Sequence, residues 1–417
     1  MKLPEQAGVV PSSQRRRLLQ MIPGGLVAAA VVGANPARAL TSATNPHNTT
    51  TALPAGWHEA WVSAEGSDAE HFGLGWISPD LQQANSVLAG FRGHGMAQNP
   101  QQPAQVVMFS RAPGRELVVV DIQKQSVLKR IDCQPGYHLA GHGCFSADGR
   151  LLYSVESNYE KGSGQIVVRD TSSWAIVADY SSGGIGPHEV RLMPDQQTLV
   201  IANGGLLTHP DRKEEVLNLD SMDSSLVYMN GATGEILSQW RLPESKASIR
   251  HLDVAPDGTV AIATQVQRAA MHNNDLVALG AIHKPGQPLQ LLAEPSMVLA
   301  QFDDYMGSVV INARERVAGF SSPRGNLVAF WNLDSLELAG YYRFHDVCGL
   351  ACSRDQKHFV LSNSAGEVRL LDAASLKENR TLRMSWNDRH WDNHMNSLLV
   401  PDLHLSFRAA ANPVTSA

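Results

Sequence analysis

The stretch GPHEVRLMPDQQTLVIANGG, residues 186–205, carries the pattern that decides the fold. A histidine and a glutamate precede a short apolar run, a Pro-Asp turn follows, and a second apolar run ends in Asn-Gly-Gly. Two short apolar runs on either side of a turn rich in Pro, Asp or Gly predict a β-hairpin. The hairpin is one copy of a repeat.

Similar stretches start near positions 92, 140, 249, 307 and 347, and most are followed by a further hairpin with an Asp or Asn turn. One residue near the start of each repeat marks its position: His94, His142, His188, His251, Ser308, Cys348 and His394. Successive residues of this series are separated by 48, 46, 63, 57, 40 and 46 positions. Four-stranded units of about 40–50 residues are typical of β-propellers. The sequence therefore predicts an all-β protein, a seven-bladed β-propeller.

The last repeat is incomplete, because too little chain follows His394 for a full blade. The segment HFGLGWIS, residues 71–78, is a spare strand near the other end of the chain. We therefore expect N-terminal strands to join the C-terminal blade and close the ring.

The first residues have the features of an export signal. Arg16 and Arg17 precede Leu18 and Leu19, and a weakly apolar stretch follows. The small residues Ala37 and Ala39 fit a cleavage site before Leu40. This arrangement resembles a twin-arginine signal peptide. We expect residues 1–39 to be the signal, 40–56 a flexible linker and 57–417 a single propeller domain in the periplasm, with no membrane span after cleavage.

Composition narrows the range of partners. The chain of 417 residues is 43% hydrophobic and 18% charged, with a formal net charge of −6. This small negative charge argues against nucleic acid as a partner, and we expect a monomer. Cys348 and Cys352 cannot pair along one strand, which would hold them about 13 Å apart. Cys133 and Cys144 flank a turn, so a disulfide and two free thiols both stay open.

The repeated histidines are the candidate site. The first strand of each propeller blade runs beside the central axis, so residues at its start meet at one mouth of the channel. We predict a ligand-binding mouth made of His94, His142, His188, Glu189, His251, Cys348 and His394. Glu189, on the opposite strand face from His188, is expected to orient a neighbouring backbone or imidazole. The alternative is that the histidines only bond the backbone of adjacent blades.

Imidazole and thiolate groups are good donors to transition metals. Iron, haem or another transition metal stay open as the cofactor, with His142, His188 and His251 as the predicted metal ligands. Secondary loop contacts are expected from Glu156, Asn203, His209 and Arg324. No complete catalytic motif occurs in the sequence, so no catalytic residue is assigned.

With these motifs in hand, the chain resembles a bacterial domain-of-unknown-function family of exported seven-bladed propellers of the YVTN/WD-like kind. The matching stretches include RGHGMAQNP, GGIGPHEVRLMPD, VIANGGLLTHPD, SIRHLDVAPDGTVAI and SSPRGNLVAFW, between about residues 70 and 400. The resemblance implies a periplasmic role connected with iron, beside imelysin-type or di-haem oxidoreductase-like proteins. It implies no established activity.

Two main functions remain open from the sequence. The first is a binding or assembly propeller of iron or haem acquisition that uses the histidine-lined mouth. The second is a propeller enzyme, lactonase-like or an oxidoreductase, that uses the same channel. A scaffold whose histidines only stabilise the blades is a third reading, because one fold can carry all of these roles.

Overall fold

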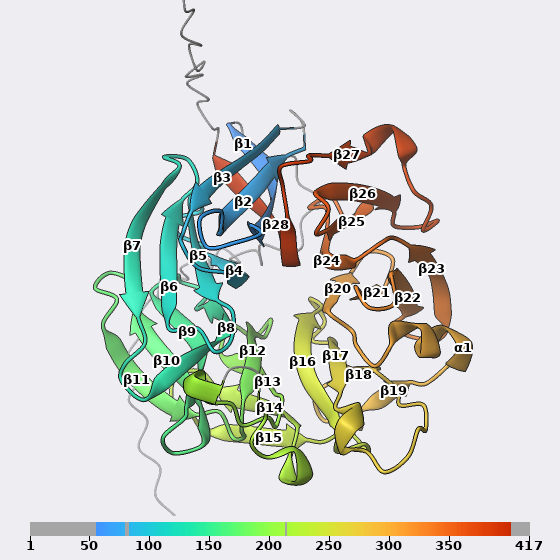
Figure 1. Cartoon of the computed structure of the whole chain (residues 1–417), viewed down its shortest axis with the longest axis horizontal. Helices are drawn as coiled ribbons and strands as arrows, with labels where there is room; N and C mark the ends of the chain where they lie inside the picture. The colour runs from blue at the N-terminus through green and yellow to red at the C-terminus, as the bar shows by residue number, and fades with distance from the viewer. Residues whose placement is uncertain (1–55, 80–82, 213–214, 402–417) are drawn as a thin grey trace, which may run out of the picture. The chain divides into compact units, whose positions relative to one another are not determined.

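The computed structural model describes residues 56–79, 83–212 and 215–401. Their strands form seven four-stranded antiparallel sheets arranged as blades in a ring (Figure 1), so the predicted seven-bladed β-propeller is confirmed. The export signal, the linker and the tail beyond residue 401 lie outside the described residues. No helix in the described part of the chain is long and apolar enough to cross a membrane.

The closing blade combines both ends of the propeller, in the order β28-β1-β2-β3. Its strands are β28 (Trp391–Pro401), β1 (Trp57–Glu65), β2 (Gly73–Ser78) and β3 (Gln83–Leu88). β28 pairs with β1 from Trp57↔Pro401 to Glu65↔Trp391. The predicted closure is therefore confirmed, and the spare strand is β2.

The other six blades follow one another along the chain. The first three are β4 (Gly93–Gln98), β5 (Gln105–Ser110), β6 (Glu116–Asp121) and β7 (Ser126–Asp132); β8 (Tyr137–Phe145), β9 (Leu151–Asn158), β10 (Ser163–Asp170) and β11 (Ile176–Ser181); and β12 (Pro187–Leu192), β13 (Thr198–Asn203), β14 (Ser225–Asn230) and β15 (Ile236–Trp240). The next three are β16 (Ala247–Val254), β17 (Val260–Val266), β18 (Gly280–His283) and β19 (Gln290–Leu292); β20 (Ser308–Asn312), β21 (Val317–Ser322), β22 (Leu327–Asn332) and β23 (Leu338–Arg343); and β24 (Val347–Cys352), β25 (His358–Asn363), β26 (Glu367–Asp372) and β27 (Met384–Ser385).

Short helices occur only in connections among the described residues. They are the one-turn helix α1 (Ser296–Leu299) and five 3-10 turns: η1 (Pro210–Arg212), η2 (Leu219–Ser221), η3 (Arg268–Ala270), η4 (Ala300–Phe302) and η5 (Arg380–Leu382).

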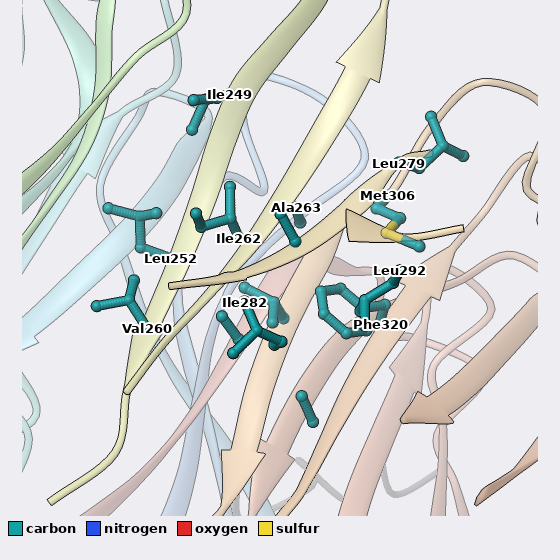
Figure 2. Close-up of a cluster of buried hydrophobic side chains, with 14 of the residues drawn as sticks. Ile249, Leu252, Val260, Ile262, Ala263, Leu279, Ile282, Leu292, Met306 and Phe320 are labelled. Carbon is teal, nitrogen blue, oxygen red and sulfur yellow. The ribbon is translucent and has the colours of Figure 1, made fainter. Parts of the chain in front are cut away.

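The hydrophobic core lies between neighbouring blades. The middle strands read as continuous apolar runs, as in LVAFWN of β22, because both faces of each sheet are covered by another sheet. The outer strand β23 instead alternates between half-buried and exposed residues. In Figure 2, Ile262, Ile282 and Phe320, which have no exposed surface, lie in the core between two adjacent blades.

The predicted Pro-Asp and Asp-Gly turns join the two inner strands of a blade. In the turn between β12 and β13, the Asp195 carboxylate accepts the backbone N–H groups of Gln197 and Thr198 at 2.9 and 2.8 Å. Gln196 between them is left-handed, with φ 62°. Asp257 binds Thr259 in the same way at 3.0 Å. These side chains replace the missing ladder bonds at the corner, and so they set where each inner strand ends.

Candidate metal centre

The innermost strands carry β-bulges where the sequence places the histidines. His188 is the extra residue between the pairs Pro187↔Asn203 and Glu189↔Ala202. Register shifts also interrupt β4, β8, β16, β24 and β28, and they span or adjoin His94, His142, His251, Cys348 and His394. A bulge bends the strand and changes the direction of a side chain. These irregularities therefore set the direction of the histidine side chains or of their immediate neighbours.

Four imidazoles meet on that axis. His94, His142, His251 and His394, called the histidine cluster below, each offer a ligand atom, and these atoms lie within 4.8 Å of one another. The rings of His251 on β16 and His394 on β28 are 4.4 Å apart, although the blades of β20 and β24 separate these strands around the ring. Side chains from non-adjacent blades can approach so closely only at the centre.

The histidine cluster is buried rather than open at a mouth. The exposed fractions of the residues are 4% for His94, 7% for His142, 2% for His251 and 7% for His394. Burial, assisted by the neighbouring histidines, lowers the pKa of His94 and His394 well below the usual value of 6.5. Burial also lowers the pKa of His142 to about 3 and that of His251 to a lesser extent. All four rings are therefore neutral at pH 7, the form that donates a lone pair to a metal.

The nitrogens are oriented by contacts around the cluster. Nε2 of His394 faces Nε2 of His94 at 3.4 Å, and Nδ1 of His394 lies 3.3 Å from the Ser308 hydroxyl. Nδ1 of His251 lies 3.1 Å from a Glu189 carboxylate oxygen. Nε2 of His142 is buried without a hydrogen-bond partner among the described residues. A carboxylate behind one imidazole and a free nitrogen ahead of another are typical of metal-binding histidines.

Two glycines make room for the rings. A Cβ atom on Gly95 would lie 2.4 Å from Nδ1 of His142, and one on Gly141 would lie 2.5 Å from Cδ2 of His94. Gly141 also has a φ of +107°, which side-chain-bearing residues rarely adopt. Gly95 and Gly141, one from each of the two GHG sequences, are thus required by the close approach of the two histidines.

Glu189 is the buried anion beside the cluster, and it does not belong to the group of ligand atoms. Its carboxylate accepts the backbone N–H of Leu252 at 3.1 Å and the Nε–H of Arg191 at 2.7 Å. Burial alone would raise the pKa of Glu189, but Arg191, His142 and His251 lower it well below its usual value. The carboxylate therefore stays ionised and holds His251 in place.

The predicted metal ligands His142 and His251 are in the cluster, but His188 is not. Alignment of the repeats on their Pro-Asp turns explains the difference, because Arg250, not His251, corresponds to His188. Both are bulged residues, and Glu189 and His251 follow them at matching positions. His188 therefore lies in the same layer as Arg250, whose guanidinium is 3.3 Å from Nδ1 of His188. The bulged Cys348 is likewise outside the ligand group, and its carbonyl accepts the Ser321 hydroxyl.

Two of the four predicted loop contacts are corrected by the structure. Glu156 has no exposed surface and forms an ion pair with Arg169 at 2.7 Å inside its blade, because the buried guanidinium needs a counter-ion. Asn203 is also fully buried and accepts the Ser182 hydroxyl at 2.7 Å. His209 does lie in a loop, with its ring 4.7 Å from that of Tyr159. Arg324 is exposed at the end of β21, over the Tyr305 ring.

All four cysteines are free thiols, so Cys133 and Cys144, for which a disulfide was left open, are unpaired.

The residues that sequence reasoning missed are Arg250, Arg111 and Tyr305. Arg250 could have been found from the sequence, because aligning the repeats on their Pro-Asp turns gives Arg250 the same position in its repeat as His188. Arg111 and Tyr305 lie outside the inner strands, so the repeat contains no signal for them.

Comparison with protein-family models matches residues 88–398 to DUF1513, a protein family of unknown function. The chain belongs to the DUF1513 family. The match covers the histidine cluster completely, from His94 to His394. No curated protein matches this DUF1513 chain. Among solved structures it is similar to hydrazine synthase of Kuenenia stuttgartiensis, at 18% identity and a TM-score of 0.44 over 78% of each chain.

Proposed function

We propose that this DUF1513 protein binds one divalent first-row transition-metal ion with the four imidazoles of the histidine cluster. The observation that carries the proposal is the meeting of four buried, neutral histidines from four blades, with ligand atoms within 4.8 Å of one another. A tetrahedral ion with bonds of about 2.1 Å holds its four nitrogens about 3.4 Å from one another. Small ring movements would therefore complete the site.

The donor set indicates the kind of ion. Imidazole nitrogen suits zinc, copper, nickel and iron, whereas sites made only of carboxylate and carbonyl oxygens suit magnesium, calcium and manganese. Cys348, the cysteine at the position of the histidines in its repeat, is not among the ligand residues of the histidine cluster. Burial raises the pKa of its thiol, which therefore stays neutral. Iron(II) is our biological candidate because of the family resemblance. Haem fits poorly, since the cluster rings lie only 4.4–5.9 Å apart, too close to admit a porphyrin.

A binding role is favoured over catalysis by the closed coordination. Four protein ligands fill a tetrahedral ion, whereas catalytic sites keep a position for water or substrate. Glu189 sits behind His251 and His142, where it would offset part of the charge of the ion without contacting it. We propose a metal-handling role in the periplasm, with an imelysin-type or di-haem oxidoreductase-like protein as partner.

Metal analysis tests this function. The full chain, produced without a histidine tag and stripped with a chelator, is loaded separately with Fe(II) under anaerobic conditions, Zn(II), Cu(II) and Ni(II). We expect one ion per chain and an X-ray absorption spectrum with only nitrogen or oxygen neighbours at about 2.1 Å. Substitution His94→Ala or His394→Ala should abolish stoichiometric binding.

The matched control is His283→Ala, which removes a fully buried histidine that bonds the Tyr228 hydroxyl at 2.6 Å, away from the cluster. This variant should keep its metal, and so should His188→Gln. The proposal fails if no ion binds, or if the cluster variants and the control lose metal equally. Metal-dependent turnover of lactones or redox dyes, lost in His394→Ala, would instead support an enzyme.

Export is tested separately. Replacement of Arg16 and Arg17 by lysine should retain the protein in the cytoplasm, as assessed by cell fractionation, if the N-terminal segment is a twin-arginine signal. Export of that variant at the normal level would contradict the proposed route.

A further inference from the structure

Above the histidine cluster lies a group of arginines that the metal proposal does not use. Arg111, Arg250 and Arg324, called the arginine collar below, surround Tyr305. All three cations act on the pKa of its hydroxyl, which burial raises above the usual value. The Arg324 guanidinium lies 5.0 Å from the centre of the Tyr305 ring. Arg250 donates a hydrogen bond to Gln265 at 3.2 Å, and Gln265 forms an isolated β-bridge with Tyr305, so Arg250 and Arg324 both lie beside this tyrosine.

The collar lies at the end of the channel where the inner strands begin. Arg250 precedes His251 on β16, and Arg111 follows β5 and donates its N–H to the carbonyl of Arg92, just before β4. Tyr305 precedes β20, while Arg324 follows β21, whose Ser321 pairs with Ser308 at the start of β20. Because the first strands of all blades run in one direction along the axis, these side chains share one mouth.

The positive charges of the collar are poorly neutralised. Among the described residues, no carboxylate forms an ion pair with Arg250 or Arg324. The Arg250 guanidinium contacts only neutral acceptors, His188 at 3.3 Å and Gln265 at 3.2 Å, and its Nε is buried without a partner. Asp392 lies nearby, but Arg92 already binds it at 2.6 Å, whereas Arg111 is 3.9 Å away.

Such an arrangement costs stability unless an anion joins it. A guanidinium buried without a counter-ion loses hydration, and a second cation nearby adds repulsion. Arg250 is in this situation, because its Nε is buried without a partner and its other contacts are to uncharged side chains. Carboxylates and phosphates suit the planar fork of arginine, which binds two oxygens at once. The Tyr305 hydroxyl, kept protonated by burial, adds a donor.

We propose that the arginine collar binds a small multivalent oxyanion, a carboxylate or phosphate compound, that enters from solvent and rests on Arg250 and His188. Arg324 is exposed and Arg111 has 39% of its side chain exposed, so the anion has a route inward. His188 connects this site to the metal centre, since its ring is 4.8 Å from that of His251. The inference goes beyond the proposed function and does not need the metal.

Calorimetric titration of the metal-free full chain with citrate and with inorganic phosphate tests the inference, with ionic strength held constant by sodium chloride. We expect saturable binding of at least one of the two, and the tighter one identifies the anion class. Arg250→Gln and Arg324→Gln should each weaken binding by about tenfold or more, as expected for the loss of a charge-assisted hydrogen bond.

Arg241→Gln is the matched control, since Arg241 is a half-exposed surface arginine paired with Asp223 at 2.7 Å. It should bind the anion normally, and thermal unfolding checks that every variant is folded. Equal affinity in Arg250→Gln, Arg324→Gln and the control would overturn the proposal, as would the absence of saturable binding. If the anion bound to metal-loaded protein and did not bind to metal-free protein, it would be a ligand of the metal, and that result would also overturn the proposed arginine collar.

Failure of the two proposals can be told apart. Anion binding in a protein that takes up no metal would refute the metal centre and leave the collar intact. Metal uptake by a protein that binds no anion would refute the arginine collar and leave the metal centre intact.

Discussion

Acidification is expected to unfold the metal-free protein far more steeply than an ordinary propeller, because folding keeps the buried histidines unprotonated. In the folded chain the pKa values of His94, His142, His251 and His394 are all lowered by burial. An unfolded histidine takes up a proton near pH 6.5. The unfolded state therefore binds more protons below this pH, and stability falls as pH falls.

The magnitude follows from the number of rings. Each histidine that is neutral in the folded state and protonated in the unfolded state contributes a slope of about 1.4 kcal/mol per pH unit. The four rings of the cluster together contribute a slope of about 5 kcal/mol per pH unit and a loss of up to about 8 kcal/mol between pH 7 and pH 5. His138, His188 and His283, whose pKa values are also lowered by burial, add to this loss. For His142 the window extends from about pH 6.5 to its folded pKa of about 3.

Glu189 adds to this effect at lower pH. Its folded pKa lies well below 4.5, so its contribution is present above the unfolded pKa and is lost as the pH falls through the folded pKa. Most domains have a free energy of unfolding of about 5–15 kcal/mol. The metal-free protein should thus lose its fold between about pH 5 and pH 4.

Urea denaturation of chelator-treated protein at several pH values between 5 and 8 measures this slope. His142→Gln removes one titrating ring and should reduce the slope by about 1.4 kcal/mol per pH unit. An unchanged m-value across the series shows that the same unfolding reaction is compared. A free energy of unfolding that is equal at pH 5 and pH 7 would refute the buried, neutral cluster.

Three further predictions concern the residues that support the site and the ring. Gly95→Ala places a Cβ 2.4 Å from Nδ1 of His142, so we expect a loss of about 1–3 kcal/mol in chemical denaturation and sub-stoichiometric metal; full metal occupancy would contradict the need for glycine. Glu189→Gln removes the charge behind His251 and should weaken metal binding by about 10–100-fold in a chelator competition; Glu189→Asp should retain more affinity than Glu189→Gln if the charge, and not the packing, is responsible. Trp61→Ala on β1 empties a site that is 2% exposed between the closing blade and its neighbour, and should destabilise the protein by about 3–5 kcal/mol; a change below about 1 kcal/mol would argue against closure through β1.

Much of the architecture could be predicted because it depends on local chemistry that repeats. The turn at Asp195 and its equivalents mark the ends of the inner strands, and the buried runs between them leave few alternatives to packed sheets. The closing blade followed from counting strands, since an unfinished last repeat and a spare N-terminal strand complete each other.

The site was less predictable because bulges shift residues by one position. The spacing of the repeats suggested that His188 and His251 are equivalent residues of two blades. The strand pairing shows instead that His188 is equivalent to Arg250, since each is the extra residue of a bulge, and the two side chains are in contact. Similarly, Glu156 looked like a charge at a corner, but it faces Arg169 across the sheet. The first correspondence follows from aligning the repeats on their turns, but the contact of Glu156 with Arg169 cannot be predicted without knowing which strands are neighbours.

The amino-acid sequence by itself determined the number of blades and brought a histidine to the start of most inner strands, because hydrophobic periodicity and turn residues act over a few neighbouring positions. Only the tertiary structure decided which imidazoles share the axis and which arginines surround its mouth. Those groups come from different blades, and their distances depend on ring closure and on the exact place of each bulge, which are long-range properties of the fold.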